Sequence, residues 1–455
     1  MSDKLATIIA LATPPGVGAI GVIRVSGPDT FPVVNRLFHG KDLEKQKTHT
    51  LHFGTIREEG DVLDEVLVSL FKAPHSYTKE DVIEISCHGS NYILQRVIKA
   101  LQNQGARLAK AGEFTQRAFL NGRFDLAQAE AVADLINSEN EAAHKAAMSQ
   151  MRGGFSEEIR KLREELVHFA SMIELELDFS EEDVEFASRD DLKKLINQIL
   201  SVVNALLESF SLGNVIKNGV PTVIAGKPNA GKSTLLNALL NEEKAIVSHI
   251  AGTTRDFIED EIVIYGVHFR FIDTAGIRDT EDQVEKIGVE RTHSKMREAS
   301  LVLYMVDLVN DTITDIHRQI NQLENLGIPF VMVGNKIDEA KPEVVAELKK
   351  DPRFVFISAL SRENLDNLKS KILEIINLDD FRTGNTIVTN ARHFESLQDT
   401  KNALHQVLDG IDGQVTNDFL AMDIRHALNS LGEITGEITT DDLLANIFSK
   451  FCIGK

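Results

Sequence analysis

Cysteine, tryptophan and positive charge are scarce in this chain. Its 455 residues include two cysteines and no tryptophan, and 49 lysines and arginines stand against 69 aspartates and glutamates, for a formal net charge of −20. Two cysteines cannot form a disulfide framework in a chain of this length, which indicates a reducing compartment, and we expect the cytoplasm. A protein that binds nucleic acid over its own broad surface is usually basic, so we expect any such contact to be local or made through a partner.

Long apolar runs are scarce as well. No apolar run approaches the roughly 20 residues that span a bilayer, so we expect no membrane association. A short apolar stretch at 5–12 follows Lys4 but leads directly into Thr-Pro-Pro-Gly, and it is predicted to be a first strand rather than a signal segment. A composition of 43% hydrophobic and 26% charged residues is typical of a globular protein, and the length predicts two to four domains.

The stretch Gly226-Lys-Pro-Asn-Ala-Gly-Lys-Ser-Thr234 fits the pattern G-x-x-x-x-G-K-[ST]. Residues 220–225 before it are typical of a buried strand, and residues 235–240 after it carry leucines at helical spacing. Glycines allow such a loop to surround a phosphate with backbone N–H groups, and the following helix adds the positive end of its dipole. We therefore predict that Lys232 reaches the terminal phosphates and that Ser233 ligates Mg²⁺.

Three further motifs follow the phosphate loop in the order that a nucleotide-binding fold requires. Asp273-Thr-Ala-Gly276 ends a predicted strand, where the aspartate can hold Mg²⁺ through water and the glycine N–H can sense the terminal phosphate. Asn335-Lys-Ile-Asp338 follows a buried strand, and its last carboxylate can accept from both the ring N–H and the amine of guanine. Ser358-Ala-Leu360 follows the last strand and can donate a backbone N–H to the guanine carbonyl. Together these motifs predict GTP as the nucleotide.

A loop rich in small residues, Gly252-Thr-Thr-Arg-Asp256, lies between the first two motifs. A threonine in this position can ligate Mg²⁺ while the terminal phosphate is present and relax when that phosphate is lost. We predict that Thr254 is this ligand.

Hydrophobic patterns predict a multidomain protein of the α/β plus α class. In the N-terminal part, strand-like runs lie at 5–12, 19–25, 50–57, 65–71 and 82–87, with a helix at 90–103. Around the phosphate loop, runs that predict a mostly parallel, doubly wound sheet lie at 221–225, 260–264, 267–272, 301–306, 328–333 and 354–357. Helical patterns on either side lie at 126–136, 156–177, 190–210, 391–410, 417–431 and 441–449. These last segments predict one helical domain that the nucleotide domain interrupts, with its two halves packed together.

Two features of the N-terminal part need a choice between interpretations. Gly16-Val-Gly-Ala-Ile-Gly21 matches the dinucleotide pattern G-x-G-x-x-G, but it leads into the β-branched run 22–25 instead of a helix, so we reject it. Arg24 and Glu84 each lie within an apolar, strand-like run. Charged side chains in such runs either face solvent or line a pocket, and the sequence alone favours solvent.

The chain resembles the MnmE (TrmE) family of tRNA-modification GTPases over essentially its full length. The resemblance rests on the inserted GTPase motifs and on four further stretches: Pro14-Pro-Gly16, Gly112-Glu-Phe-Thr-Gln-Arg-Ala-Phe-Leu-Asn121, Asp125-Leu-Ala-Gln-Ala-Glu130 and Phe451-Cys-Ile-Gly-Lys455. It implies an N-terminal folate-binding and dimerisation domain at 1–121, a helical domain at 122–213 and 380–455, and an inserted GTPase domain at 214–379. The motifs and the resemblance together assign GTP contacts to Asn229, Ala230, Gly231, Lys232, Ser233, Thr234, Ser248, His249, Ile250, Ala251, Gly252, Thr253, Thr254, Asp273, Thr274, Ala275, Gly276, Asn335, Lys336, Asp338, Ser358, Ala359 and Leu360.

The residue after Asp-Thr-Ala-Gly is Ile277, where Ras-like enzymes place a glutamine that orients the attacking water. Isoleucine cannot form a hydrogen bond, and the sequence offers no evident arginine finger. The family resemblance implies that a potassium ion takes this role and that two GTPase domains meet to close the site. It places potassium ligands at Asn229, Ser248, Ile250 and Thr253. It also implies that Glu285 orients the catalytic water, although a solvated glutamate at a helix start fits the sequence equally well.

The resemblance further implies the purpose of GTP hydrolysis. Family members act as homodimers with a flavoprotein partner, MnmG (GidA), to add an aminomethyl-type group to C5 of the wobble uridine of certain tRNAs, with a tetrahydrofolate derivative as the one-carbon donor. The implied folate contacts are Arg24, Glu84, Arg123 and Lys455. Arg123 stands where the family has a lysine, which keeps the charge but changes the hydrogen-bond geometry. The competing prediction is a GTP-dependent ribosome-assembly or binding switch without modification chemistry.

Overall fold

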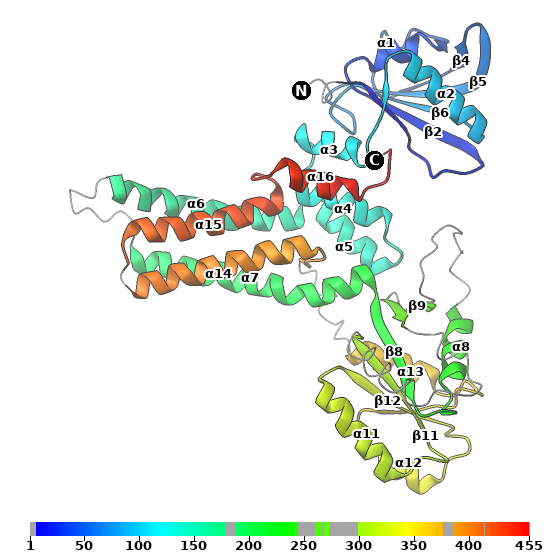
Figure 1. Ribbon diagram of the computed structural model, residues 1–455, viewed down its shortest axis with the longest axis vertical. Coiled ribbons are helices and arrows are strands. Elements are labelled where there is room, and N and C mark those ends of the chain that lie inside the picture. The colour runs from blue at the N-terminus through cyan, green and yellow to red at the C-terminus, as the bar shows by residue number, and fades with distance from the viewer. Residues whose placement is uncertain are drawn as a thin grey trace. The chain divides into compact units, whose positions relative to one another are not determined.

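The computed structural model describes residues 6–178, 188–243, 260–265, 267–272, 299–375, 386–413 and 415–454. The chain forms two compact units. One comprises Met1–Ile136, Ala147–Ser201 and Glu395–Lys455, and the other comprises Asn137–Ala146 and Val202–Phe394. Figure 1 labels the helices and strands of both units.

The N-terminal part of the first unit is built on a seven-stranded sheet in the order β3-β4-β5-β6-β2-β1-β7. The strands are β1 (Ile8–Leu11), β2 (Gly18–Ser26), β3 (Phe38–His39), β4 (Thr50–Glu58), β5 (Asp61–Phe71), β6 (Val82–Gly89) and β7 (Arg107–Leu108). Helices α1 (Thr30–Asn35) and α2 (Asn91–Asn103) contribute to its core. The five predicted strands and the helix at 90–103 are confirmed, and β2 runs through the rejected dinucleotide pattern.

Helix α2 packs closely on this sheet because Gly21, the strand residue that faces it, has no side chain. Leu94, Val97 and Leu101 of α2 are buried in one cluster with sheet residues such as Ile23. A Cβ on Gly21 of β2 would lie 2.6 Å from a methyl carbon of Leu94, closer than real Cβ contacts come, so a larger residue here would push the helix away.

Helix α3 (Glu113–Leu120) follows the sheet and was not predicted. Gly112 precedes it in the left-handed region, with φ of 65°. Inside the fold, Glu113 accepts hydrogen bonds from Arg107 at 2.6 and 2.8 Å and from Arg117 at 3.0 Å. Arg117 also donates to Glu80 and to the carbonyl of Ala6. We call Glu80, Arg107, Glu113 and Arg117 the buried ion cluster. Its ion pairs hold helix α3 in place, and the hydrophobic pattern alone does not predict this short helix.

Helices from both sides of the nucleotide domain pack together, as predicted. They are α4 (Leu126–Ile136), α5 (Glu141–Met151), α6 (Gly154–Asp178), α7 (Arg189–Asn218), α14 (Ala391–Asp412), α15 (Asn417–Thr435) and α16 (Asp441–Ser449). Helices α6 and α15 lie side by side (Figure 1), and Arg425 of α15 pairs with Glu174 of α6 at 2.6 Å. Leu126 of α4 shares a buried cluster with Phe448 of α16 and Phe451.

Helix α7 is long and apolar enough to cross a membrane by length and composition. The expectation that no apolar run approaches this length is therefore wrong for α7. Its residues Leu192, Ile196, Leu200 and Val203 recur at helical spacing and are all at most 5% exposed. A core helix of a helical domain shows this same one-sided burial, so the length of α7 is explained without a bilayer.

The nucleotide domain of the second unit contains a six-stranded sheet in the order β13-β12-β11-β8-β10-β9. The strands are β8 (Val220–Gly226), β9 (Asp260–Ile264), β10 (Val267–Phe271), β11 (Leu301–Asp307), β12 (Phe330–Asn335) and β13 (Phe354–Phe356). All neighbouring pairs are parallel except β9 and β10, which confirms the predicted mostly parallel sheet.

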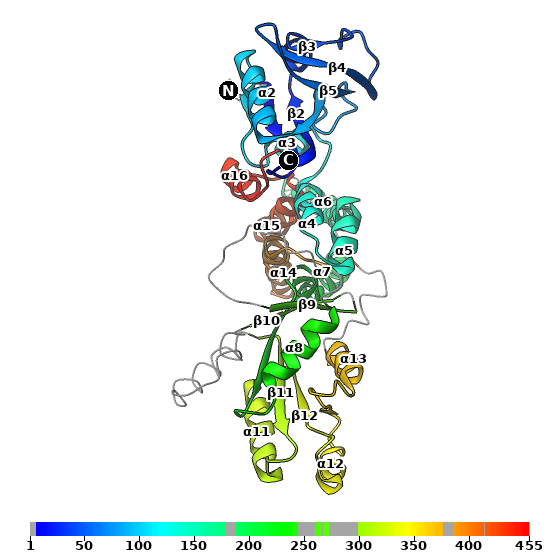
Figure 2. The ribbon, with the colours of Figure 1, turned by 90° about the vertical axis from the view of Figure 1, so that its right-hand side faces the viewer.

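Helices cover both faces of this sheet, as Figure 2 shows. Helices α8 (Lys232–Glu243) and α13 (Leu365–Ile375) place leucines in one buried cluster with the strands. Helices α11 (Ile313–Leu326) and α12 (Pro342–Leu348) contribute to a second cluster. The carboxyl ends of β8, β12 and β13 lie at one edge of the sheet, where ligands bind in doubly wound folds.

Candidate functional site

The phosphate loop leaves β8 at Gly226 and enters α8 at Lys232. Gly226 and Gly231 have φ of 144° and 99°, and Asn229 between them is left-handed with φ of 63°. A Cβ on Gly226 would lie 2.5 Å from the Met305 carbonyl oxygen. The loop therefore needs glycine for backbone conformation and for space, which is what the sequence pattern predicted.

Lys232 folds back over this loop. Its Nζ donates to the carbonyl oxygens of Gly226 at 2.9 Å and Lys227 at 2.8 Å. Burial lowers the pKa of Lys232, because the charged form loses hydration. A partly desolvated ammonium held over backbone amides is well placed to meet a phosphate. Ser233 and Thr234, the other predicted contacts in this stretch, lie in the first turn of α8.

Asn335 connects three of the predicted motifs through one side chain. It is 4% exposed, its Nδ2 donates to the Ala230 carbonyl at 2.8 Å, and its Oδ1 accepts from the Ala359 N–H at 2.9 Å. The sequence analysis assigned Asn335 to GTP. The structure gives it a bridging role between the phosphate loop and the loop at Ser358, which contiguous sequence could not reveal.

Asp307, at the carboxyl end of β11, is a residue that the sequence analysis missed. The Nζ of Lys336 lies 2.6 Å from its carboxylate. Burial acts to raise the pKa of Asp307, but the hydrogen bonds from Lys336, Asn310 and backbone N–H groups outweigh it and hold the pKa below its usual value. Its position at the end of a fully buried strand was the available signal, because such ends line the ligand edge of the sheet.

The predicted guanine-recognition residues divide into a buried and an exposed set. Ser358 and Ala359 are 1% and 3% exposed, whereas Leu360 is 82% exposed. Asp338 is also exposed, so its carboxylate is accessible to a ligand. The N–H groups of Ser358 and Ala359 already donate to the Glu363 carbonyl and to Asn335, so the exposed groups of these two loops are the Asp338 carboxylate and Leu360.

Several predicted residues lie outside the described part of the chain. They are Ser248, His249, Ile250, Ala251, Gly252, Thr253, Thr254, Asp273, Thr274, Ala275, Gly276, Glu285 and Lys455. The assignments of the Thr254 magnesium ligand, the Glu285 water contact and the three loop potassium ligands therefore stay predictions.

Arg24, Glu84 and Arg123 come together in the first unit around Tyr77. Arg24 and Glu84 are cross-strand partners on β2 and β6, and their guanidinium and carboxylate groups lie 2.9 Å apart. The guanidinium carbons of Arg24 and Arg123 lie 5.1 and 5.3 Å from the centroid of the Tyr77 ring, within cation–π range. The sequence leaves two interpretations for Arg24 and Glu84, a position on a solvated face or in the lining of a pocket. Glu84 lines a cavity, which supports the second interpretation for this residue.

This cavity has a volume of about 570 Å³, a size that suits a small organic ligand. It is lined by His49, Phe71, Pro74, His75, Ser76, Tyr77, Lys79, Val82, Glu84 and Arg123. We call it the Tyr77 cavity.

One wall of the Tyr77 cavity is the segment 74–79, which α3 and the following turn hold in place. The Tyr77 hydroxyl is 2.9 Å from the Thr115 hydroxyl, and Asn121 Nδ2 donates to the Thr78 carbonyl at 2.6 Å. Arg123 donates to the Ser76 carbonyl. Tyr77 could not be predicted as a site residue, because the residues that hold it are far away in the chain.

The C-terminal stretch contacts Arg24, the ion-pair partner of Glu84. Arg24 Nη1 donates to the Gly454 carbonyl at 3.3 Å, and the Gly112 N–H is 3.5 Å from the Cys452 carbonyl. Gly454 has φ of 100°, and a Cβ on it would lie 2.2 Å from the Leu11 carbonyl oxygen. Glycine is therefore required where this stretch meets β1. Lys455, the predicted fourth folate contact, follows directly.

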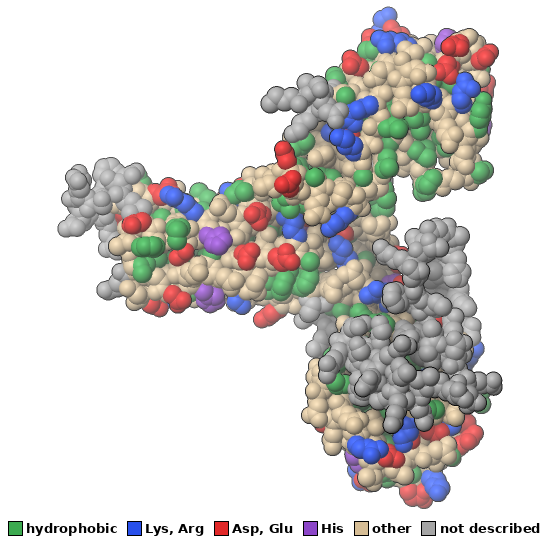
Figure 3. Space-filling view, in the orientation of Figure 1, with side chains coloured by type: hydrophobic (Ala, Val, Ile, Leu, Met, Phe, Trp, Pro, Cys, Tyr) green, Lys and Arg blue, Asp and Glu red, His purple; other side chains and the backbone are tan. Residues whose placement is uncertain are grey.

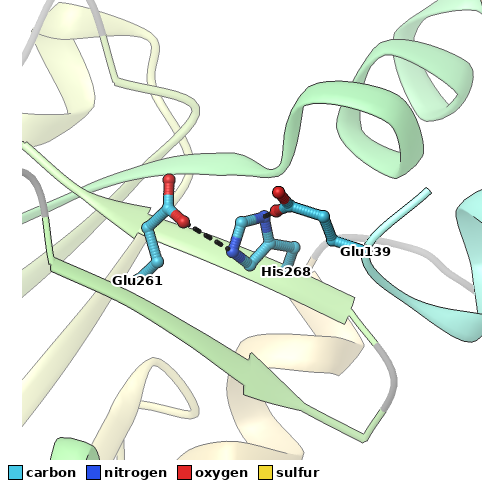
Figure 4. Close-up of side chains that lie close together, drawn as sticks. All are labelled: Glu139, Glu261 and His268. Carbon is cyan, nitrogen blue, oxygen red and sulfur yellow. Dashed lines mark ion pairs between the residues drawn. The ribbon is translucent and has the colours of Figure 1, made fainter. Parts of the chain in front are cut away.

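Glu139, Glu261 and His268 form a cluster in the second unit that could be mistaken for a metal site (Figure 4). His268 Nε2 lies 3.3 Å from Glu261, and its Nδ1 lies 4.0 Å from Glu139. One ligand atom from each residue lies within 4.8 Å of the other two, which is close enough to hold a metal ion, but both glutamates are exposed and each lies beside a different ring nitrogen. The His268 hydrogen bond lowers the pKa of Glu261. We interpret the cluster as an ion-pair bridge.

A glycine-rich phosphate loop at the carboxyl edge of a mostly parallel sheet, tied to an Asn-Lys-x-Asp motif, defines a P-loop GTPase. Comparison with known proteins makes the assignment more specific. A family model described as "GTP-binding protein TrmE N-terminus" matches residues 7–123, and one described as "MnmE helical domain" matches residues 126–452. The chain belongs to the MnmE family, which confirms the resemblance found in its motifs.

Curated relatives match along nearly the whole chain. A protein of Cytophaga hutchinsonii named "tRNA modification GTPase MnmE" is 60% identical over 449 residues, covering 99% of this chain and 98% of that protein. A protein of Christiangramia forsetii with the same name is 54% identical and covers 99% of both. Among solved structures, the G domain of the T. maritima FeoB iron transporter is 28% identical over 34% of this chain and 98% of that one. Its TM-score is 0.26.

Proposed function

We propose that this protein is a cytoplasmic GTP hydrolase that takes part in tRNA modification. The observation that carries the proposal is the similarity, over 99% of the chain, to proteins named tRNA modification GTPases. The geometry supports it, because the phosphate loop, Lys232 and the Asn335 bridge are arranged as a GTP site requires. Mg²⁺ would be held by Ser233 and Thr254, and it would neutralise charge on the β- and γ-phosphates.

The modification that we propose is the addition of a carboxymethylaminomethyl-type group to C5 of the wobble uridine of certain tRNAs. A flavoprotein partner of the MnmG type would take part, and tRNA would be contacted mainly through that partner. A tetrahydrofolate derivative would bind in the Tyr77 cavity. There Glu84 can accept hydrogen bonds from the amino edge of the pterin, and Arg123 can meet a carboxylate of the tail.

Cells that lack this protein are expected to lose the modified wobble nucleoside, as measured by nucleoside analysis of their tRNA. The wild-type chain should restore it, and Glu84→Gln should restore less than about a tenth of it, because the amide replaces one acceptor oxygen with an NH₂ group that would face a donor of the pterin edge. Glu141→Gln is the matched control, since Glu141 pairs with Lys145 on an exposed surface. Unchanged tRNA in the deletion strain would contradict the proposed function and favour a binding switch.

Potassium is proposed to accelerate GTP hydrolysis. Asn229, in its left-handed position within the phosphate loop, would be a ligand together with Ser248, Ile250 and Thr253, and the ion would offset charge that develops between the phosphates. Glu285 would orient the water. Steady-state GTP turnover in potassium chloride is expected to exceed turnover in sodium chloride at equal ionic strength by at least about tenfold. Equal rates in the two salts would remove potassium from the mechanism.

A homodimer is proposed through the N-terminal sheet. Several large apolar side chains are exposed there, among them Ile20 at 65%, Leu51 at 57%, Phe53 at 65% and Leu67 at 42%. Phe53 and Leu67 are direct cross-strand partners on β4 and β5. Figure 3 shows hydrophobic side chains at the surface of this part of the molecule. Exposed apolar groups gathered on one sheet favour burial against a second copy.

A further inference from the structure

The lining of the Tyr77 cavity contains more cationic side chains than carboxylates. Among its described lining residues there is a single carboxylate, Glu84, which pairs with Arg24 at 2.9 Å. The other lining groups that can meet an anion are Arg123, Lys79, His49 and His75. The whole chain carries a net charge of −20, so a cavity with excess cationic and N–H donor groups is a local exception. Such a cavity attracts anions.

Of two neighbouring acids outside the lining, Glu80 is balanced by an arginine, and Asp81 lowers the excess without removing it. Glu80 accepts from Arg117 and from the hydroxyl of Ser26. The Asp81 carboxylate accepts from the Ala73 N–H at 2.9 Å. By contrast, Lys79 donates to a neutral acceptor, the Gly122 carbonyl, at 2.7 Å, and its charge is left uncompensated by that bond.

The cavity also has two different ends. Near Glu84 it is enclosed, since the side chains of Arg24 and Glu84 are 16% and 27% exposed and Val82 beside them is 2% exposed. The residues His49 and His75 are exposed. A folate whose pterin meets Glu84 would therefore direct its glutamate tail outward, toward the exposed side chains of Arg123, His49 and His75.

We propose that the Tyr77 cavity prefers a folate that carries several γ-linked glutamates, and that Lys79, with His75 and His49, binds the carboxylates beyond the first glutamate. This inference rests on the proposed folate site. A single glutamate supplies two carboxylates, which Arg123 and the C-terminal stretch can meet, whereas the outer donors would meet only the carboxylates of a longer tail. Exposed ion pairs are individually weak, so each added glutamate should tighten binding by about two- to fivefold.

The test is calorimetric titration of the full-length protein with tetrahydrofolate monoglutamate and with its triglutamate. The wild type is expected to bind the triglutamate about tenfold more tightly, with the preference shrinking at high salt because exposed pairs are screened. Lys79→Gln should reduce that preference to about threefold or less, and Lys79→Gln combined with His75→Gln should reduce it further. Lys72→Gln is the matched control, because Lys72 donates to the Glu44 carbonyl and lies outside the cavity lining.

Equal affinity of the wild type for the two folates would overturn the inference, and so would a preference that Lys79→Gln leaves unchanged. Monoglutamate binding in the same titrations separates the two proposals. If the monoglutamate binds but the tail makes no difference, the folate site stands and the tail subsite fails. If neither folate binds, the folate part of the proposed function fails with it. Thermal unfolding of each variant shows whether it is folded.

Discussion

Replacing Gly231 by alanine is expected to weaken GTP binding by at least about a hundredfold. A Cβ at this position would lie 2.2 Å from Asn335 Nδ2, and the residue has φ of 99°, which alanine rarely adopts. Asn335 would have to leave the carbonyl of Ala230, the N–H of Ala359 or both. Each unmet buried hydrogen bond costs about 1–3 kcal/mol, and backbone strain adds a similar amount. Titration with a fluorescent guanine nucleotide measures the effect.

Gly327→Ala is the matched control for this substitution. Gly327 ends helix α11 with φ of 67°, but a Cβ on it would meet no atom within 4 Å. It should lower stability by about 1 kcal/mol through backbone strain alone and leave nucleotide affinity unchanged. If Gly231→Ala bound nucleotide as tightly as Gly327→Ala, the Asn335 bridge would have no part in forming the site.

Replacing Glu113 by glutamine is expected to lower the free energy of unfolding by about 3–5 kcal/mol. Glu113 is 7% exposed and accepts hydrogen bonds from Arg107, Arg117 and the Lys110 N–H. The substitution removes the negative charge that balances the guanidinium groups of Arg107 and Arg117 in the buried ion cluster. Chemical denaturation followed by circular dichroism measures the loss. Glu141→Gln, at an exposed pair, should stay within about 0.5 kcal/mol of the wild type.

The same residue predicts a pH dependence. Burial acts to raise the pKa of Glu113, but hydrogen bonds from Arg107, Lys110 and Arg117 lower it from 4.5 to about 2. A carboxyl with a lowered pKa in the folded state stabilises the fold fully above its unfolded pKa. That contribution is lost as the pH falls from 4.5 toward 2. The Glu113→Gln variant should lose less stability over this interval, and an equally steep loss would assign the dependence to other carboxyls.

Much of the fold could be predicted from local pattern. The strands around the phosphate loop have continuous apolar runs because both faces of the sheet are covered, and β11 is buried along its whole length. Helix α3 could not be predicted in this way. Its eight residues are too few for a clear hydrophobic period, and contacts with Arg107 and Glu80, which lie outside the helix, hold it in place.

The two candidate sites also differ in how far local sequence predicts them. The phosphate loop could be predicted because its chemistry lies in nine contiguous residues, 226–234. The family resemblance implies Arg24, Glu84 and Arg123 as folate contacts, but local pattern could not predict the Tyr77 cavity. Arg24 and Glu84 meet only through the β2–β6 register, and a shift of one residue would place them on opposite faces. Asn335 shows the same limit, since its motif predicts a ligand contact and only the fold shows that it joins two loops 24 and 105 residues away.

The amide of Asn335 has a consequence for nucleotide exchange. The Asn335 side chain is hydrogen-bonded to Ala230 in the phosphate loop and to Ala359 in the loop at Ser358. Movement of either loop away from the nucleotide would therefore break a hydrogen bond that also holds the other loop in place. A bound guanine nucleotide would then be released in one concerted event, with no long-lived state in which only one end has come free.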